Sequence, residues 1–236
     1  MNWNINKRSR IMLIIFLFSI GLLISIMVFA APGVVTKDVA LLESKIVALQ
    51  NQINAIVTPQ VFKIGDQHEG GIVFYVTKDG QHGLIAALSD QSTSAPWAPY
   101  DGCHLCTGAM GHGIGAGAMN TAMIVAINSY IAPSDEFAAK LAAGYAVSED
   151  GITPCTVSTV KTCYGDWYLP SKEELHLMYT NLHLNKLGSF ADEPYWSSTL
   201  DETGNGFQWA INFANGIAIN NDQFFEKQKV RAIRAF

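Results

Sequence analysis

The residues best suited to chemistry in this 236-residue chain are four cysteines in two close pairs, Cys103 with Cys106 and Cys155 with Cys163. Thiols at such short spacing form disulfides in an oxidising compartment, or bind zinc together with histidine. The zinc alternative would combine the first pair and His104 with a distant cysteine. His104 lies inside the CxxC segment, however, and the chain has no second CxxC. We therefore predict two disulfides and no metal. Four cysteines allow three pairings, which stay open, and we favour the local one because each close pair encloses a short loop.

A second candidate group is a basic cluster in the last ten residues, where apolar and polar residues alternate as in a strand. Alternate side chains of a strand share one face, so three of these cations can project together and bind an anionic ligand. In the structural alternative, the arginines pair with acids and the lysines solubilise an edge strand. Three aromatic residues are candidates for stacking on sugar, with core burial as the competing role. The predicted ligand-binding residues are Lys227, Lys229, Arg231, Arg234, Trp97, Tyr100 and Trp209.

The sequence offers no recognisable catalytic motif. A GxSxG elbow, an HExxH pair, a phosphate loop ending in lysine and a dinucleotide fingerprint are all missing. The glycine-rich stretch from Gly108 to Gly117 lacks the lysine that meets phosphate charge, so we expect a flexible or tightly turned loop there. We predict a protein that is not an enzyme and needs no cofactor. The enzymatic alternative is an unrecognised hydrolase that uses an exposed carboxylate or histidine.

The charge of the chain excludes one large class of partners. From Val61 onward there are ten Lys and Arg against eighteen Asp and Glu, which gives this part a formal charge of −8. Nucleic-acid-binding domains carry basic surfaces, so we predict no nucleic-acid partner. Paired carboxylates such as Asp192 with Glu193 and Asp201 with Glu202 could bind calcium, but we expect them to be solvated turn residues.

The N-terminus is typical of a membrane-targeting segment. Residues 11–30 are twenty apolar or small residues without a charge, and Lys7, Arg8 and Arg10 precede them. The basic flank stays inside, so residues 1–31 are predicted to be a signal anchor or a cleaved signal peptide, with both alternatives open. Everything after this segment is expected to be extracytoplasmic: on the bacterial cell surface, secreted, or anchored to the inner membrane and facing the periplasm.

Residues 35–57 have the spacing of a coiled coil. Apolar residues recur at alternating intervals of four and three, which is the a/d pattern of a parallel coiled coil. The pattern leaves dimer or trimer open, and a single amphipathic helix packed on its own domain is the alternative. The residues of this seam are Val35, Val39, Leu42, Ile46, Leu49, Ile53 and Ile56. Thr58 and Pro59 are predicted to end the helix.

Residues 60–236 are long enough for one domain with a full core, and their patterns predict an α+β fold. GIVFYVT and QHGLIAAL flank a Lys-Asp-Gly turn and predict a β-hairpin. We expect three helices: one with Met119, Met123, Ile124 and Ile127 along one face, one from Ser134 to about Val147, and one capped by Ser171 with Glu174 in a capping box. From Tyr195 onward, short alternating stretches predict strands.

Three ordered segments carry a family resemblance: GDWYLPSKEEL at residues 165–175, YWSST at 195–199 and VRAIRAF at 230–236. They resemble the signature blocks of the DUF1566 family, and the stretch from about Gly65 onward is similar to the C-terminal domains of Legionella collagen-like adhesins. The resemblance implies a C-type-lectin-like fold, a homotrimer, binding of host sulfated glycosaminoglycans and no enzymatic activity.

The chain departs from those adhesins in three respects. It has no collagen repeats, its cysteine pairs lie outside the family signature, and its domain is acidic where polysulfate binding uses clustered Lys and Arg. We predict a non-enzymatic trimeric surface adhesin or binding module that recognises glycans, with sulfated glycosaminoglycans as one candidate ligand, and contacts a membrane through residues 11–30. The alternative is a periplasmic protein-interaction or structural module that binds no glycan.

Overall fold

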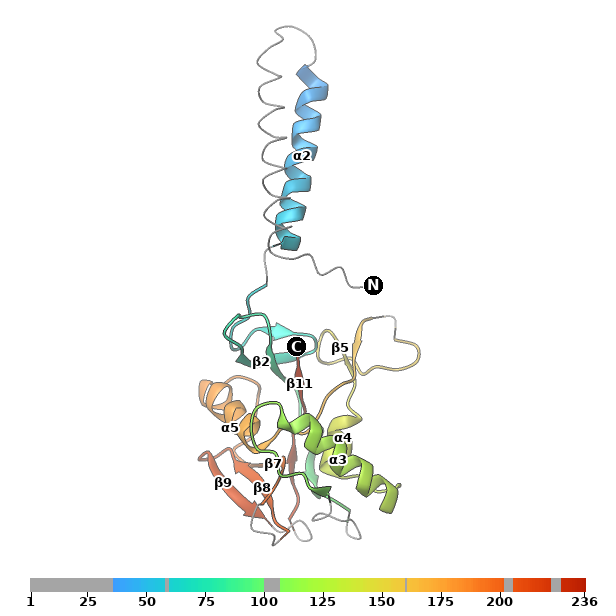
Figure 1. Ribbon diagram of the computed structural model, residues 1–236, viewed down its shortest axis with the longest axis vertical. Coiled ribbons are helices and arrows are strands. Elements are labelled where there is room, and N and C mark those ends of the chain that lie inside the picture. The colour runs from blue at the N-terminus through green and yellow to red at the C-terminus, as the bar shows by residue number, and fades with distance from the viewer. Residues whose placement is uncertain (1–35, 58–59, 100–106, 160, 202–205, 222–225) are drawn as a thin grey trace. The chain divides into compact units, whose positions relative to one another are not determined.

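The computed structural model describes residues 36–57 and 60–236, apart from residues 100–106, 160, 202–205 and 222–225 (Figure 1). The chain divides into two units, Met1–Pro59 and Gln60–Phe236. The predicted membrane-targeting segment at 11–30 lies outside the described residues, as do Thr58 and Pro59, which are predicted to end the coiled-coil helix. Within the part of the chain that is described, no helix is both long and apolar enough to cross a bilayer.

In the first unit, helix α2 spans Thr36–Val57 without interruption. Two predicted seam residues, Leu42 and Leu49, are 58% and 57% exposed, and Ile46 is partly buried. The helix therefore presents an open apolar seam in the single chain. Whether this seam forms a coiled coil stays a prediction.

The second unit, here called the head, is built on two main sheets. A four-stranded sheet has the order β1-β2-β3-β11, and a five-stranded sheet has the order β4-β10-β7-β8-β9. Neighbouring strands are antiparallel except β10 and β7, which are parallel. The bounds are β1 Gln67–His68, β2 Gly71–Val76, β3 Gly83–Ala87, β4 Ser92–Ala95, β7 Pro194–Leu200, β8 Gln208–Asn212, β9 Ile217–Asn221, β10 Gln228–Val230 and β11 Ile233–Ala235.

Three α-helices and a short two-stranded sheet complete the head (Figure 1). They are α3 Ala116–Ile131, α4 Ala138–Ala143, α5 Lys172–Asn181 with the 3-10 turn η2 His183–Asn185, and the strands β5 Val147–Ser148 and β6 Cys163–Tyr164. The predicted α+β class, the hairpin of β2 and β3 and the strands after Tyr195 are therefore confirmed.

The predicted start of the second helix of the head is wrong. Helix α4 begins at Ala138 instead of Ser134, because Phe137 is extended and fully buried in the core. The backbone N–H of Ala138 also donates to Pro96 O at 2.9 Å, which ties this point to a distant segment. The core contact of Phe137 thus prevails over the local capping signal of Ser134.

The predicted apolar face of α3 is buried only in part: Ile124 lies in the core and Met123 packs against it, whereas Met119 does not face inward. Met119 is 66% exposed, and Met123 and Ile127 are only partly buried. The helix turns a face of small and polar residues inward, where the side chains of Asn120 and Thr121 bond to the backbone of other segments. The buried residues of α3 are Gly117, Asn120, Thr121, Ile124 and Asn128.

The two main sheets are joined by the short β3–β4 connection and by a segment near residue 230. β10 lies between β4 and β7 in one sheet, and β11 follows two residues later at the edge of the other. Val230, Ala232 and Ile233 in this segment are all fully buried. Trp167 and Trp196 of the signature segments lie in the same core cluster as Val230 and Ala232.

One predicted disulfide, between Cys155 and Cys163, is present. It closes the loop between β5 and β6. The other predicted pair, Cys103 with Cys106, lies outside the described residues. In the described ranges, no three or more His, Cys, Asp or Glu side chains gather in a group able to hold a metal ion.

Candidate functional site

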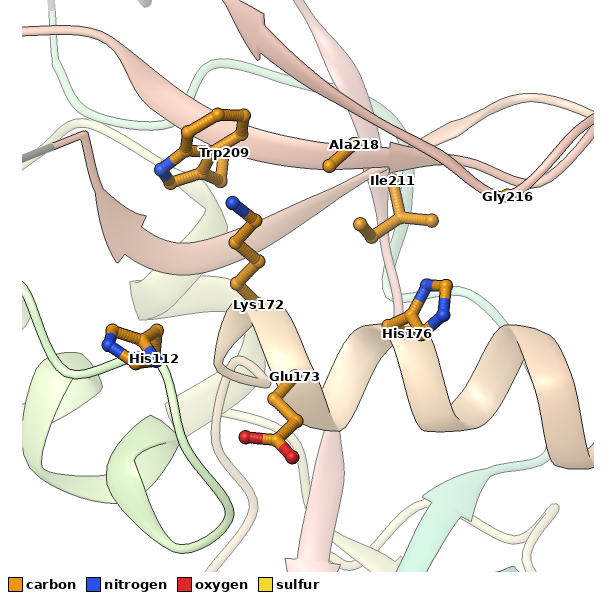
Figure 2. A pocket seen from close by; sticks show the side chains of 8 residues that line it. All are labelled: His112, Lys172, Glu173, His176, Trp209, Ile211, Gly216 and Ala218. Carbon is orange, nitrogen blue, oxygen red and sulfur yellow. The ribbon is translucent and has the colours of Figure 1, made fainter.

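An open pocket of about 400 Å³ lies between helix α5, strands β8 and β9 and the glycine-rich loop that precedes α3 (Figure 2). Its floor is apolar and its rim carries charged and polar side chains. The lining residues are His112, Lys172, Glu173, His176, Trp209, Ile211, Gly216 and Ala218. Of the predicted ligand-binding residues that the structure describes, only Trp209 lines this pocket.

The strongest contact in the pocket joins Lys172 to Trp209. Lys172 is the first residue of α5, and its Nζ lies 3.3 Å from the centroid of the Trp209 ring. Figure 2 shows the lysine side chain extending from the helix to the indole. Such a cation–π contact contributes about 0.5–2 kcal/mol, depending on its exposure. It holds both side chains in place at the mouth of the pocket.

The position of Lys172 follows from the start of α5. Ser171 is the N-cap, and its side chain accepts the N–H of Glu174 at 3.3 Å. Glu174 Oε2 in turn accepts the N–H of Ser171 at 2.7 Å. The predicted capping box is therefore confirmed, and it fixes the turn from which Lys172 and Glu173 project.

Glu174 also fastens the glycine-rich loop to the helix. Its Oε1 accepts the N–H of Gly115 at 2.8 Å, and Gly115 has a φ of +87°, a conformation that favours glycine. Burial raises the pKa of Glu174, opposed by the N–H groups of Ser171, Gly115 and Gly117 that bond to its carboxylate. Burial and the nearby Glu174 carboxylate likewise raise the pKa of Tyr168. A buried carboxylate therefore holds the loop in a tight turn.

This anchored loop places His112 at the pocket. The N–H of Glu173 and the hydroxyl of Ser171 both donate to His112 O, at 3.0 and 3.1 Å. The hydroxyl of Thr199 donates to Gly111 O at 2.8 Å and ties the loop to β7. The side chains of His112, Glu173 and His176 are exposed, so they are accessible to a ligand.

The pocket can bind a ligand by stacking and hydrogen bonding. Trp209 supplies a partly buried aromatic surface, Lys172 supplies donors, and Glu173 supplies acceptors. In Figure 2 the Glu173 carboxylate points away from Trp209, so Glu173 and the Lys172–Trp209 pair face different parts of the cavity. The arrangement fits the recognition of an uncharged or weakly charged polar molecule with an apolar face.

Most of the predicted basic cluster has a structural role. Arg231 is 2% exposed, and its Nε donates to Asp90 Oδ1 at 2.7 Å. Arg234 bonds to Glu69 and Asp166. The burial of Arg231 rules out ligand contact in this conformation because no ligand atom can reach it, so that prediction is wrong.

The two lysines of this cluster differ. Lys229 is 8% exposed, and its Nζ lies 3.8 Å from Asp90 and 3.7 Å from Glu193. Lys227 is exposed. The four cations therefore do not project together, because three of them compensate acidic groups of the head.

The predicted aromatic residues also separate. Trp97 is fully buried, and its indole N–H donates to Ser197 O at 2.7 Å, so its prediction as a sugar-stacking residue is wrong. Tyr100 lies outside the described residues. Trp209 is the predicted aromatic residue that a ligand can reach in the described structure.

Sequence reasoning missed four polar residues of the pocket: His112, Lys172, Glu173 and His176. A signal for the last three was present. They lie in the first turns of the helix that Ser171 caps. Because Glu174 and Leu175 face inward there, Lys172, Glu173 and His176 lie on the outer side of the helix. His112 had no such signal, because the apolar and polar residues of the glycine-rich loop have no regular spacing.

Fold and pocket together define an α+β domain with an open, aromatic-lined binding pocket. No protein-family model matches the chain, and no curated protein matches it significantly. The resemblance to the DUF1566 family therefore stays a prediction.

Proposed function

We propose that the head is a non-enzymatic glycan-binding module and that the pocket beside Trp209 is its sugar site. The observation that carries this proposal is the partly buried indole in an open cavity of about 400 Å³, with a lysine, a glutamate and two histidines around it. The volume is in the range of small-ligand sites and suits one or two sugar rings.

Sugars present a C–H face and a rim of hydroxyl groups. The indole of Trp209 can pack against such a face, as aromatic side chains do with other partly apolar ligands. Hydroxyl groups can accept from Lys172 and donate to Glu173, since the two side chains address different parts of the cavity. The ligand must displace the Lys172 ammonium from the indole, so modest affinity per site is expected.

Modest affinity per site favours a multivalent protein. The open seam of α2 supports self-association, and we propose the trimer that the family resemblance implies. Binding of several sites to one surface then multiplies weak contacts. The proposal includes a C-type-lectin-like fold, membership of the DUF1566 family and an extracytoplasmic surface location. The disulfide between Cys155 and Cys163 supports an oxidising compartment.

Sulfated glycosaminoglycans are less well supported than other glycans as the ligand. Lys229, Arg231 and Arg234 of the predicted basic cluster are paired with acidic residues of the head itself. The head has a formal charge of −8, which opposes binding of a polysulfate. We therefore place the glycan contact at Trp209 and Lys172 instead of at the C-terminal cluster.

The test is a glycan array with the purified full-length chain, followed by calorimetry on the best ligand. Trp209→Ala should weaken binding about thirtyfold, which corresponds to the roughly 2 kcal/mol of a binding hot spot. Lys227→Ala, in the former basic cluster, is the matched control and should bind as the wild type does. Binding to no glycan, with a protein partner recovered instead, would favour the interaction module; sugar binding that survives Trp209→Ala would move the site elsewhere.

A further inference from the structure

Helix α3 is amphipathic in the reverse sense. Its buried face carries the polar residues Asn120, Thr121 and Asn128, and its exposed residues include Met119 and Tyr130. Surface helices of soluble domains normally bury their apolar stripe and expose polar groups. A helix with this reversed arrangement is expected where another molecule covers its outer face.

The polar residues have a specific reason to face inward. Asn120 Oδ1 accepts the N–H of Gly111 at 3.2 Å, and Leu169 N donates to Thr121 Oγ1 at 3.0 Å. These bonds fasten α3 to the glycine-rich loop and to the start of the α5 region. The rotation of the helix is therefore fixed by the fold, and its apolar residues cannot turn inward.

The exposed apolar surface continues beyond the helix. Met110 and Ile114 of the preceding loop are 51% and 43% exposed, and Met119 and Tyr130 are 66% and 89% exposed. From Gly108 to Ser134 the sequence contains no Asp, Glu, Lys or Arg. Depletion of charge around large apolar residues distinguishes interface cores from ordinary surface.

A groove of about 380 Å³ runs beside this face. Its wall consists of alanines, Thr121 and Val125 from α3, Ala143 from α4, and Asp166, Trp167 and Tyr168 from the segment before α5. Asp166 is the charged residue of this wall, and it bonds to Arg234. Small side chains permit close approach of another backbone element. The groove and the outer face of α3 together are called the α3 surface below; on α3 it includes Ala118, Met119, Ala122, Val125, Ala126 and Tyr130.

We propose that the α3 surface is a contact between the heads of two copies of this chain. Two arguments select a second copy as the occupant. The first is charge: each head carries −8, so most of its surface repels another head, whereas the charged residue that lines the α3 surface, Asp166, is bonded to Arg234. A mainly apolar surface with a paired charge at its margin is compatible with its own copy.

The second argument is proximity. The same chain carries an open apolar seam on α2, and only residues 58–59 separate the last residue of this helix from the head. Two copies joined in parallel through α2 would keep their heads within a short tether of each other. At the resulting effective concentration, in the millimolar range, even a small head-to-head contact forms. The contact is independent of the sugar site and goes beyond it.

The test uses photochemical cross-linking of the full-length chain in phosphatidylcholine vesicles. The photoreactive residue p-benzoylphenylalanine replaces Met119 in one preparation and Leu184, a 59% exposed leucine far from α3 in sequence, in the matched control. We expect a cross-linked species of twice the chain mass from position 119, at least tenfold more abundant than from position 184. Adding Ala122→Asp to the position-119 chain should reduce its yield at least tenfold, while Leu184→Asp should leave it unchanged.

Each other outcome overturns the proposal. Equal yields at positions 119 and 184 would mean nonspecific collision, and no dimeric species at position 119 would mean that the surface does not contact a second copy. Adducts with lipid alone would make the α3 surface a membrane contact. Thermal unfolding of the Ala122→Asp chain at an unchanged midpoint would show that reduced cross-linking is not caused by misfolding.

Discussion

Replacing the buried Arg231 should destabilise the head strongly. Its guanidinium donates to Asp90, to Ala87 O at 2.9 Å and to Gly188 O at 2.8 Å, and it lies 4.2 Å from the ring centroid of Phe190. Few other side chains in the head bring together so many distant segments. The prediction concerns Arg231→Met, which retains much of the volume and removes the charge.

The expected magnitude follows from what remains after the substitution. Asp90 would stay largely buried without its guanidinium partner, since its side chain is only 16% exposed. Removing one member of a buried ion pair costs about 3–5 kcal/mol when the other charge is left uncompensated. Lys229, whose Nζ lies 3.8 Å from Asp90, would still compensate part of the Asp90 charge, so we expect a loss near the lower end of this range. Domains have a total stability of about 5–15 kcal/mol, so the variant should lose a large part of it.

Urea unfolding of the full-length chain at pH 7, followed by tryptophan fluorescence, measures this loss. The matched control is Lys227→Met, an exposed cation of the same segment, which should change the unfolding free energy by no more than about 0.5 kcal/mol. A loss below about 1 kcal/mol for Arg231→Met would refute the structural role. Weaker ligand binding at unchanged stability would instead restore the basic cluster as a binding site.

Two further predictions concern the anchoring of the glycine-rich loop. Burial raises the pKa of Glu174 in the native chain above its ordinary value of 4.5. At a pH between 4.5 and the native pKa, the native chain therefore binds more protons than the unfolded chain. The free energy of unfolding consequently falls as the pH rises through the native pKa. Glu174→Gln should cost about 1–3 kcal/mol at pH 7 and lose this pH-dependent component in a urea series from pH 4 to 8, whereas Glu173→Gln should keep it. Gly117→Ala should lower stability by about 1–3 kcal/mol despite the helix propensity of alanine, because a Cβ there would lie 2.3 Å from Glu174 Oε2. Gly113→Ala, whose Cβ would have 3.7 Å of space, is its control, and equal thermal midpoints for the two alanine variants would contradict the clash.

The elements that were predictable are those with local signals. The capping box of Ser171 and Glu174 joins residues three apart, and the hairpin of β2 and β3 depends on a short turn. The disulfide of Cys155 and Cys163 spans a separation of eight residues. Sequence patterns report such short-range interactions directly, which is why these features are confirmed.

The rotation of α3 was not predictable from its own residues. Its apolar periodicity placed Met119 on the same face as Ile124, but the bond of Thr121 to Leu169 joins residues 48 apart. The pairing of Arg231 with Asp90 spans 141 residues. A pattern within one segment contains no information about such distant partners.

The pocket was predictable only in part, for the same reason. Trp209 was recognised as a candidate from its residue type, whereas its neighbours come from a loop near His112, from the start of α5 and from the turn at Gly216. These segments meet only in the folded head. Their common location is a product of sheet order, which the sequence alone did not supply.

The segment near residue 230, which joins the two main sheets, has a kinetic consequence. β10 completes the pairing of β4, and β11 completes the pairing of β3, so both partners lie more than a hundred residues earlier in the chain. Pairing at such long range makes folding slow, since a large loop must close before either contact forms. Until residues 228–235 are available, the head keeps three open strand edges, those of β3, β4 and β7, and an unfilled core. The time for which such an edge is exposed is the time in which aggregation competes with folding, so the last strands to emerge set how long the chain needs protection by a chaperone.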